Sequence, residues 1–119
     1  MRYILLIYDD EKASAGMSQA EMEAGLGAWF KYTEDLQAAG KMLGGEALQA
    51  TTTATTVRLK EGRRLTTDGP FAETKEQLGG YYIISGEDLD EAMHWAAKMP
   101  HLGRGGAVEV RPVMELDAN

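Results

Sequence analysis

The chain has 119 residues, of which 44% are apolar and 26% are charged; it has no cysteine and a formal net charge of −7. This length and composition suit one ordinary globular domain and exclude disordered and membrane-spanning classes. Disulfides, zinc thiolate sites and thiol catalysis are excluded, and the acidic balance argues against a nucleic-acid partner. Because the first apolar run is too short for a signal peptide, we expect a soluble, cytoplasmic protein without membrane contact.

A continuous apolar run over residues 2–8 opens the chain and predicts a strand covered on both faces. Residues 9–17 are expected to form a polar loop. Ser18 and Glu21 then fit a capping box at a helix start, and Gly40 is a natural stop for that helix. Between them, apolar and small side chains recur at helical spacing: Met22, Leu26, Trp29, Phe30, Thr33 and Leu36.

The middle of the chain, residues 42–67, is predicted to be mainly extended. Residues 42–48 predict a short strand, and residues 57–60 and 63–67 predict a hairpin that turns at Glu61-Gly62. The one basic cluster lies here: Arg58, Lys60, Arg63 and Arg64. Charged hairpin tips keep an edge strand from pairing with other chains, with an anion or partner contact as the alternative.

A second strongly apolar strand is expected over residues 80–85, followed by a helix that opens with a capping box at Asp88 and ends before Pro100. The last strand is expected over residues 107–114. Because Pro112 has no amide to give to a ladder, this strand should lie at a sheet edge.

The order strand, helix, hairpin strands, strand, helix, strand predicts one α+β domain over residues 1–119 with a ferredoxin-like, split βαβ fold. Two helices would cover one face of an antiparallel sheet, so the other face needs a partner. We therefore expect an isologous homodimer. Its surface would come from Tyr3 or Tyr8, Tyr81 or Tyr82, and the valines of the last strand.

The most specific segment of the chain is the nine-residue string from Asp68-Gly69-Pro70-Phe71 to Glu76. With it, the chain resembles the YCII-related proteins, and within them the branch named for the Asp-Gly-Pro-Phe motif. The match covers nearly the whole chain: residues 2–8, 39–40, 68–76, 79–82, 95–100 and 109–113. The resemblance implies a dimeric α/β barrel with a pocket near the Asp68-Gly69-Pro70-Phe71 turn, and no settled function. Some members are encoded beside extracytoplasmic-function sigma factors.

In the wider family, a His near the start of the first helix, paired with an Asp, is proposed as an acid–base dyad, and one relative is a dehydrochlorinase of a muconate-type compound. This chain has no His in its first helix, and Trp29 stands about where that His would be. The dyad therefore does not carry over.

The candidate catalytic residues are Asp68, as a base or hydrogen-bond acceptor, and His101, as an acid. Asp68 could equally cap the amides of its own turn, and Gly69 is expected to supply unusual dihedrals there. Trp29, Phe71, Lys75 and Arg111 are candidate ligand-binding residues, against alternatives as core, anchor or ion-pair residues. No metal site and no cofactor is expected, since the two histidines stand seven residues apart without ligand spacing.

Three hypotheses about function follow from these residues. The first is a small dimeric pocket protein that binds a polar or carboxylate-bearing molecule, with acid–base lyase or isomerase activity. The second is a non-catalytic accessory or ligand-sensing module, associated with extracytoplasmic-function sigma factor signalling. The third is a dimeric structural protein without a ligand.

Overall fold

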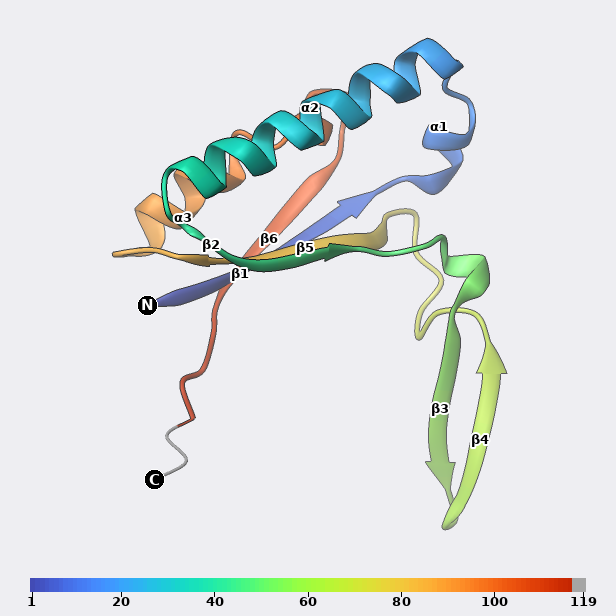
Figure 1. Cartoon of the computed structure of the whole chain (residues 1–119). Coiled ribbons are helices and arrows are strands. Elements are labelled where there is room, and N and C mark those ends of the chain that lie inside the picture. The colour runs from blue at the N-terminus through green and yellow to red at the C-terminus, as the bar shows by residue number, and fades with distance from the viewer. Residues whose placement is uncertain (117–119) are drawn as a thin grey trace.

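Four antiparallel strands form the central sheet of the computed structural model, which describes residues 1–116 (Figure 1). The strand order is β2-β5-β1-β6. The central strands are β1 (Arg2–Asp9) and β5 (Gln77–Ser85), and the edge strands are β2 (Met42–Ala47) and β6 (Ala107–Pro112). Each βαβ unit is split by a strand of the other unit, which is the ferredoxin-like arrangement. The predicted fold class is confirmed, as is the edge position of the strand that contains Pro112.

The two long helices lie on one face of this sheet (Figure 1). They are α2 (Gln19–Ala38) and α3 (Leu89–Ala96). The predicted capping box starts α2: the Ser18 hydroxyl accepts from the amide of Glu21, and the Glu21 carboxylate accepts from the amide of Ser18, both at 3.1 Å. These bonds favour the ionised carboxylate and so lower the pKa of Glu21.

Two local predictions were wrong. Residues 9–17 are not all loop, because Asp10 caps a short helix, α1 (Glu11–Ala15). At α3, Asp88 accepts from the amide of Glu91 as expected, but the Glu91 carboxylate accepts from Glu87 rather than from Asp88. The second box is therefore shifted by one residue. Two short 3₁₀ helices complete the chain, η1 (Thr51–Thr53) and η2 (Pro100–Arg104).

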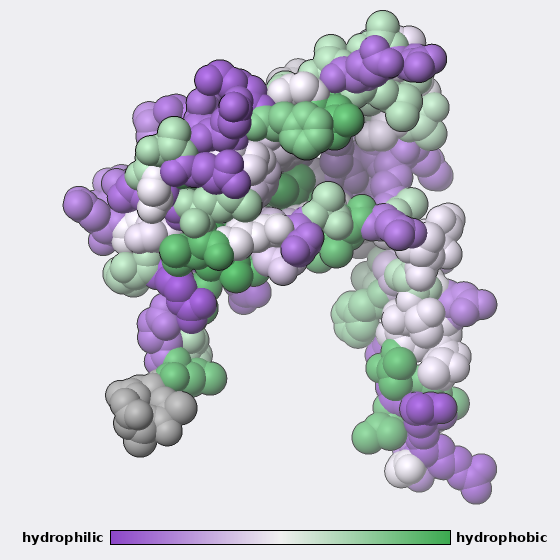
Figure 2. All heavy atoms as spheres, viewed as in Figure 1, coloured by the Kyte–Doolittle hydropathy of each residue, from purple (hydrophilic) through white to green (hydrophobic). Residues whose placement is uncertain are grey.

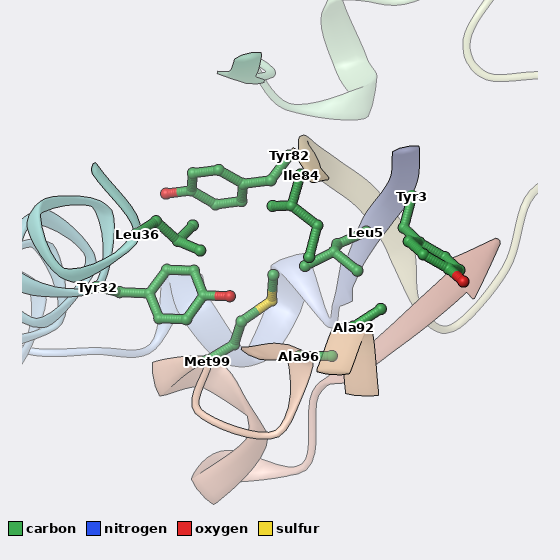
Figure 3. Packing of buried hydrophobic residues seen from close by; sticks show 9 residues of the cluster. All are labelled: Tyr3, Leu5, Tyr32, Leu36, Tyr82, Ile84, Ala92, Ala96 and Met99. Carbon is green, nitrogen blue, oxygen red and sulfur yellow. The ribbon is translucent and has the colours of Figure 1, made fainter. Parts of the chain in front are cut away.

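The core lies between the sheet and the two helices, as Figure 3 shows. The sheet contributes Tyr3, Leu5, Tyr82 and Ile84. The helix layer contributes Tyr32, Leu36, Ala92 and Ala96, together with Met99 just after α3. Alternation along the strands puts Ile4, Leu6 and Ile83 on the opposite face. Tyr3 and Tyr82 are thus core residues, and Val108 and Val110 pack against the core. Only Tyr8 and Tyr81 of the predicted dimer residues remain on the open face.

The burial of Tyr32 leads to a prediction for the stability of the fold at alkaline pH. Its hydroxyl donates to the carbonyl of Trp95 at 2.8 Å, and burial raises the pKa of the Tyr32 phenol above its usual value of 10.0. The unfolded chain therefore releases this proton at a lower pH than the folded chain. Stability should be full below pH 10 and fall by about 1.4 kcal/mol per pH unit above it.

The matched variant is Tyr32→Phe, which removes the titrating group. It should cost about 1 kcal/mol at neutral pH, because the Trp95 carbonyl loses its donor. It should also flatten the loss of stability between pH 10 and pH 11 in urea unfolding curves. An equally steep alkaline limb in Tyr32→Phe would contradict the assignment to this phenol.

A separate two-stranded hairpin, which we call the arm, extends away from the sheet on the side opposite the helices (Figure 1). It consists of β3 (Thr55–Lys60) and β4 (Arg63–Asp68). The turn lies at Glu61 and Gly62, with φ angles of 52° and 77°, as a type I′ turn requires. The predicted hairpin and its turn residues are confirmed.

Within residues 1–116, no helix is both long enough and apolar enough to cross a membrane.

Candidate ligand site

A hollow of about 720 Å³ lies between α2 and the part of the sheet formed by β2 and β5. It opens to solvent beneath α2 in Figure 2. Its volume is in the range of small-molecule sites, and apolar side chains form most of its walls.

The roof of the hollow is one face of α2, formed by Leu26, Trp29, Phe30 and Thr33 at helical spacing. The sheet is reached only by the second half of α2, where Tyr32 and Leu36 are buried. As a result Leu26 and Phe30 are 56% and 65% exposed, although the sequence pattern puts them on the apolar face. Large apolar side chains so exposed over a concave surface are characteristic of a binding site.

The inner wall is a set of packed aromatic rings around Trp29. Its ring stacks on Tyr82 with centroids 6.4 Å apart, meets Tyr32 edge-on at 5.9 Å, and lies 5.3 Å from the ring of His101. Contacts with three rings fix the orientation of Trp29. The indole therefore presents a rigid apolar surface to the hollow.

Two hydroxyls supply the polar group of this wall. The Thr33 hydroxyl donates to the carbonyl of Trp29 at 3.0 Å and lies 2.6 Å from the hydroxyl of Tyr82. Because Thr33 has only one proton to give, Tyr82 must donate to Thr33. Both protons are thus used within the protein. The pair can still accept a hydrogen bond from a ligand, but it has none to donate.

The floor is kept open by close pairing of β2 and β5. A Cβ atom on Gly45 would lie 2.8 Å from the carbonyl oxygen of Tyr81 and 2.9 Å from the ring of Tyr82. A Cβ atom on Gly80 would lie 2.8 Å from the carbonyl oxygen of Glu46. Any larger residue at either position would force the strands apart. Glycine here lets backbone, rather than side chains, line the hollow.

The rim is acidic, and two of its carboxylates are already bonded. Asp9 accepts from the Arg104 guanidinium at 2.7 Å. Glu11 accepts from both the amide and the hydroxyl of Thr51, at 2.8 and 2.7 Å. Glu46 pairs with Tyr81 across β2 and β5, so its backbone lines the hollow while its side chain lies on the open face of the sheet. Among the described residues, Arg104 is the one cationic side chain that lines the hollow, and it is paired.

His101 lies behind the wall and does not line the hollow. Its side chain is 1% exposed, and Nε2 lies 2.9 Å from the carbonyl oxygen of Ala107. The bond fixes the tautomer with the proton on Nε2, and Nδ1 has no partner among the described residues. Any reactant would have to displace Trp29 to reach this imidazole.

The other predicted site residues lie elsewhere. Asp68 is exposed at the end of β4, and no residue of the segment 68–76 lines the hollow. Phe71 is 76% exposed and packs against the Arg58 guanidinium at 4.9 Å, and Lys75 is exposed. Arg111 is exposed on β6, opposite Ile4, on the open face of the sheet. Of the six predicted residues, only Trp29 borders the hollow.

The structure therefore does not join Asp68 and His101 as an acid–base pair within one chain. Asp68 is on the arm, whereas His101 is enclosed in the body by Trp29 and Gly106. Sequence reasoning did not single out Leu26, Thr33 and Gly45, which line the hollow, as site residues. One signal was available: glycines inside a predicted strand mark a close approach of backbone.

A metal centre has no support in the described part of the chain. Within residues 1–116, no three His, Asp or Glu side chains gather closely enough to hold an ion.

Comparison with known proteins identifies the family. The model of the YCII-related domain matches residues 1–117. An uncharacterised protein of Rhizobium meliloti (strain 1021) is 38% identical over 114 residues, which cover 95% of this chain and 92% of that protein. The chain thus belongs to the YCII-related domain family, as its sequence motifs predicted.

Proposed function

We propose that this protein binds a small molecule in the hollow beneath α2. The ligand has an apolar body and a hydrogen-bond donor at one end, such as an ammonium group. The observation that carries the proposal is the exposure of Leu26 and Phe30, at 56% and 65%, on the helix face that roofs a hollow of about 720 Å³. Burial of both side chains against a ligand would remove this unfavourable apolar exposure.

The polar groups of the hollow favour a ligand that donates a hydrogen bond over a ligand that bears a carboxylate. The Thr33 and Tyr82 hydroxyls can only accept, because both of their protons are used. A ligand carboxylate would have to take Arg104 from Asp9 at an acidic rim. An ammonium would instead meet the accepting oxygens of this hydroxyl pair. The carboxylate-bearing ligand expected from the sequence is therefore the less favourable choice.

Binding is better supported than acid–base catalysis. No histidine or lysine lines the hollow among the described residues, and Asp9 and Glu11 are held in hydrogen bonds. His101 has the right chemistry for a proton transfer, but Trp29 stands between it and the hollow. This arrangement suits a ligand-sensing or accessory role better than a lyase or isomerase.

The test is a thermal-shift screen with matched pairs of compounds, each pair being an apolar amine and the carboxylate of the same skeleton. We expect the amines to stabilise the protein, by about 2.7 kcal/mol at a concentration one hundred times Kd. Leu26→Ala and Phe30→Ala should each weaken binding about tenfold or more, since each removes an apolar contact.

Met22→Ala is the matched control. Met22 is 57% exposed one turn earlier on the same helix, but it does not line the hollow. It should leave binding unchanged. Stabilisation by carboxylates alone would contradict the ligand class, and equal loss of binding in all three variants would contradict the site.

We also propose that the protein is a homodimer paired through the open face of its sheet. The centre of that face is apolar: Ile4 pairs with Ile83 and Leu6 with Tyr81 across β1 and β5. Glu109 and Arg111 follow on β6, opposite Leu6 and Ile4. In a two-fold arrangement, an acidic and a basic residue at one edge can meet their opposites on the partner.

Leu6→Asp should break this dimer, because it buries two carboxylates at the centre of the interface. We expect a monomer in sedimentation velocity at concentrations where the unmodified protein is dimeric, with a helical circular-dichroism spectrum that shows the fold intact. Met22→Asp, on α2 and so on the other side of the sheet from the open face, should remain dimeric. A folded Leu6→Asp dimer would exclude this face as the interface.

A further inference from the structure

Among residues 1–116, the arm packs against no other helix or strand of its own chain. The strands β3 and β4 contact chiefly each other, and their apolar side chains are open to solvent. Val57, Leu59 and Leu65 are 59%, 77% and 45% exposed. A two-stranded hairpin with both faces in water is at best marginally stable. Some further surface is therefore needed to hold the arm in place.

The dimensions of the chain point to the same need. Its radius of gyration is 16.5 Å, whereas a compact domain of this length has about 13.5 Å. Its accessible surface is 8576 Å², against about 6,300 Å² for a monomer of this mass. An excess of roughly 2,000 Å² per chain is what a permanent dimer of this size would bury.

Charge indicates which surface the arm fits. Residues 55–68 hold four basic and two acidic side chains, a net charge of +2, in a chain of net charge −7. The rest of the chain therefore carries −9. The arm cannot use its own body, because it projects from the sheet on the side opposite the helices (Figure 1). The acidic body of a second copy attracts the arm as a whole, although strand pairing puts only Arg64 of the four basic side chains on the face of Val57 and Leu59.

We propose that the arm reaches around a second copy of this chain and packs on its body, with the face that carries Val57 and Leu59 turned toward the partner. This inference rests on the proposed dimer. Stacked sheets lie about 10 Å apart, and six-residue strands extend about 20 Å, so the arm passes the partner's sheet and reaches its helix layer. The other face of the arm is less free, because Phe71 covers Arg58.

The Asp68-Gly69-Pro70-Phe71 turn has a role in this proposal, as the base that sets the direction of the arm. Gly69 has a φ of 111°, which confirms the unusual dihedral expected of it. Its amide donates to the carbonyl of Ala54 at 2.7 Å, and its carbonyl accepts from the Thr56 hydroxyl at 2.8 Å. The turn is thus fastened to the start of β3. It positions the arm rather than a reactive group.

The first experiment measures the dimer dissociation constant of Val57→Ser/Leu59→Ser by sedimentation equilibrium. Both side chains are exposed in the single chain, so the fold should not change. We expect Kd to rise about a hundredfold, since two apolar contacts with the partner are lost. The control is Met114→Ser/Leu116→Ser, which removes apolar side chains that are 77% and 81% exposed near the C-terminus. Equal Kd values for the two double variants would overturn the proposal.

The second experiment locates the arm. Because the chain has no cysteine, Leu59→Cys places a single thiol that can carry a benzophenone cross-linker. Equal amounts of ¹⁵N-labelled and unlabelled chains are mixed and irradiated. Cross-links between labelled and unlabelled peptides of the body are expected. Cross-links confined to one chain, in a protein that is dimeric, would overturn the proposal for the arm but would not contradict the sheet-face dimer. A monomeric unmodified protein would overturn both, without bearing on the ligand site.

Discussion

Gly106→Ala should destabilise the protein by about 3 kcal/mol, and so lower the thermal midpoint by about 10 °C. The added Cβ would lie 2.2 Å from Cδ2 of His101 and 2.9 Å from the His101 carbonyl oxygen. The imidazole cannot move aside, because it is 1% exposed and packs against Trp29. The loop must shift instead, and this would break the hydrogen bond of His101 to Ala107.

Gly103→Ala is the matched control for this prediction. It lies three residues earlier, in η2, and a Cβ there meets no atom within 4 Å. Its effect on the unfolding free energy should stay within about 0.5 kcal/mol. In a His101→Ala background, Gly106→Ala should lower the unfolding free energy much less, because the obstructing ring is gone. An undiminished destabilisation by Gly106→Ala in that background would show that the ring is not the obstacle.

Trp29→Ala should cost about 3 kcal/mol of stability and also uncover His101. The indole packs on the rings of Tyr82, Tyr32 and His101, so its loss removes contacts with all three. It would also open a passage from the hollow to the buried imidazole. The same variant therefore tests the aromatic wall and the isolation of His101.

Chemical modification makes this exposure measurable. The chain has two histidines, of which His94 is exposed and His101 is buried. Diethyl pyrocarbonate should modify only His94 in the unmodified protein and both residues in Trp29→Ala, as peptide mass spectrometry would show. Phe30→Ala, which leaves the indole in place, should behave like the unmodified protein. Rapid modification of His101 in the unmodified protein would contradict its enclosure.

Much of the fold could be predicted because its signals are local. Ser18 and Glu21 mark a helix start, Glu61-Gly62 specifies a hairpin turn, and Pro112 restricts its strand to a sheet edge. The short helix α1 carries a cap at Asp10, but five residues give too little periodicity to distinguish a helix from a loop.

The site could not be predicted because it depends on tertiary distances. The helical period correctly groups Leu26, Trp29 and Phe30 on one face, but it does not reveal how far the sheet extends beneath them. In the same way, strand alternation separates Tyr3 from Tyr8 without saying which of the two meets the helices. The hollow arises because α2 extends beyond the part of the sheet on which it packs. No single residue specifies how far the helix extends.

The Asp68–Glu76 string is specific to a family, but it does not lie at the proposed ligand site. It was the best guide to the YCII-related family, yet none of its residues lines the hollow. Its glycine and its hydrogen bonds to β3 serve the base of the arm. The polar groups that could meet a ligand come instead from unremarkable positions, a threonine of α2 and a tyrosine of β5.

The central claim, that a ligand occupies the hollow beneath α2, is tested most directly by methyl NMR of ¹³C-methionine-labelled protein. Met42 lines the hollow, whereas Met93 lines a separate shallow groove between α3 and β6 and Met114 is 77% exposed near the C-terminus. Titration with a stabilising amine should move the Met42 methyl resonance and leave those of Met93 and Met114 in place. A shift at Met93 with none at Met42 would contradict the claim.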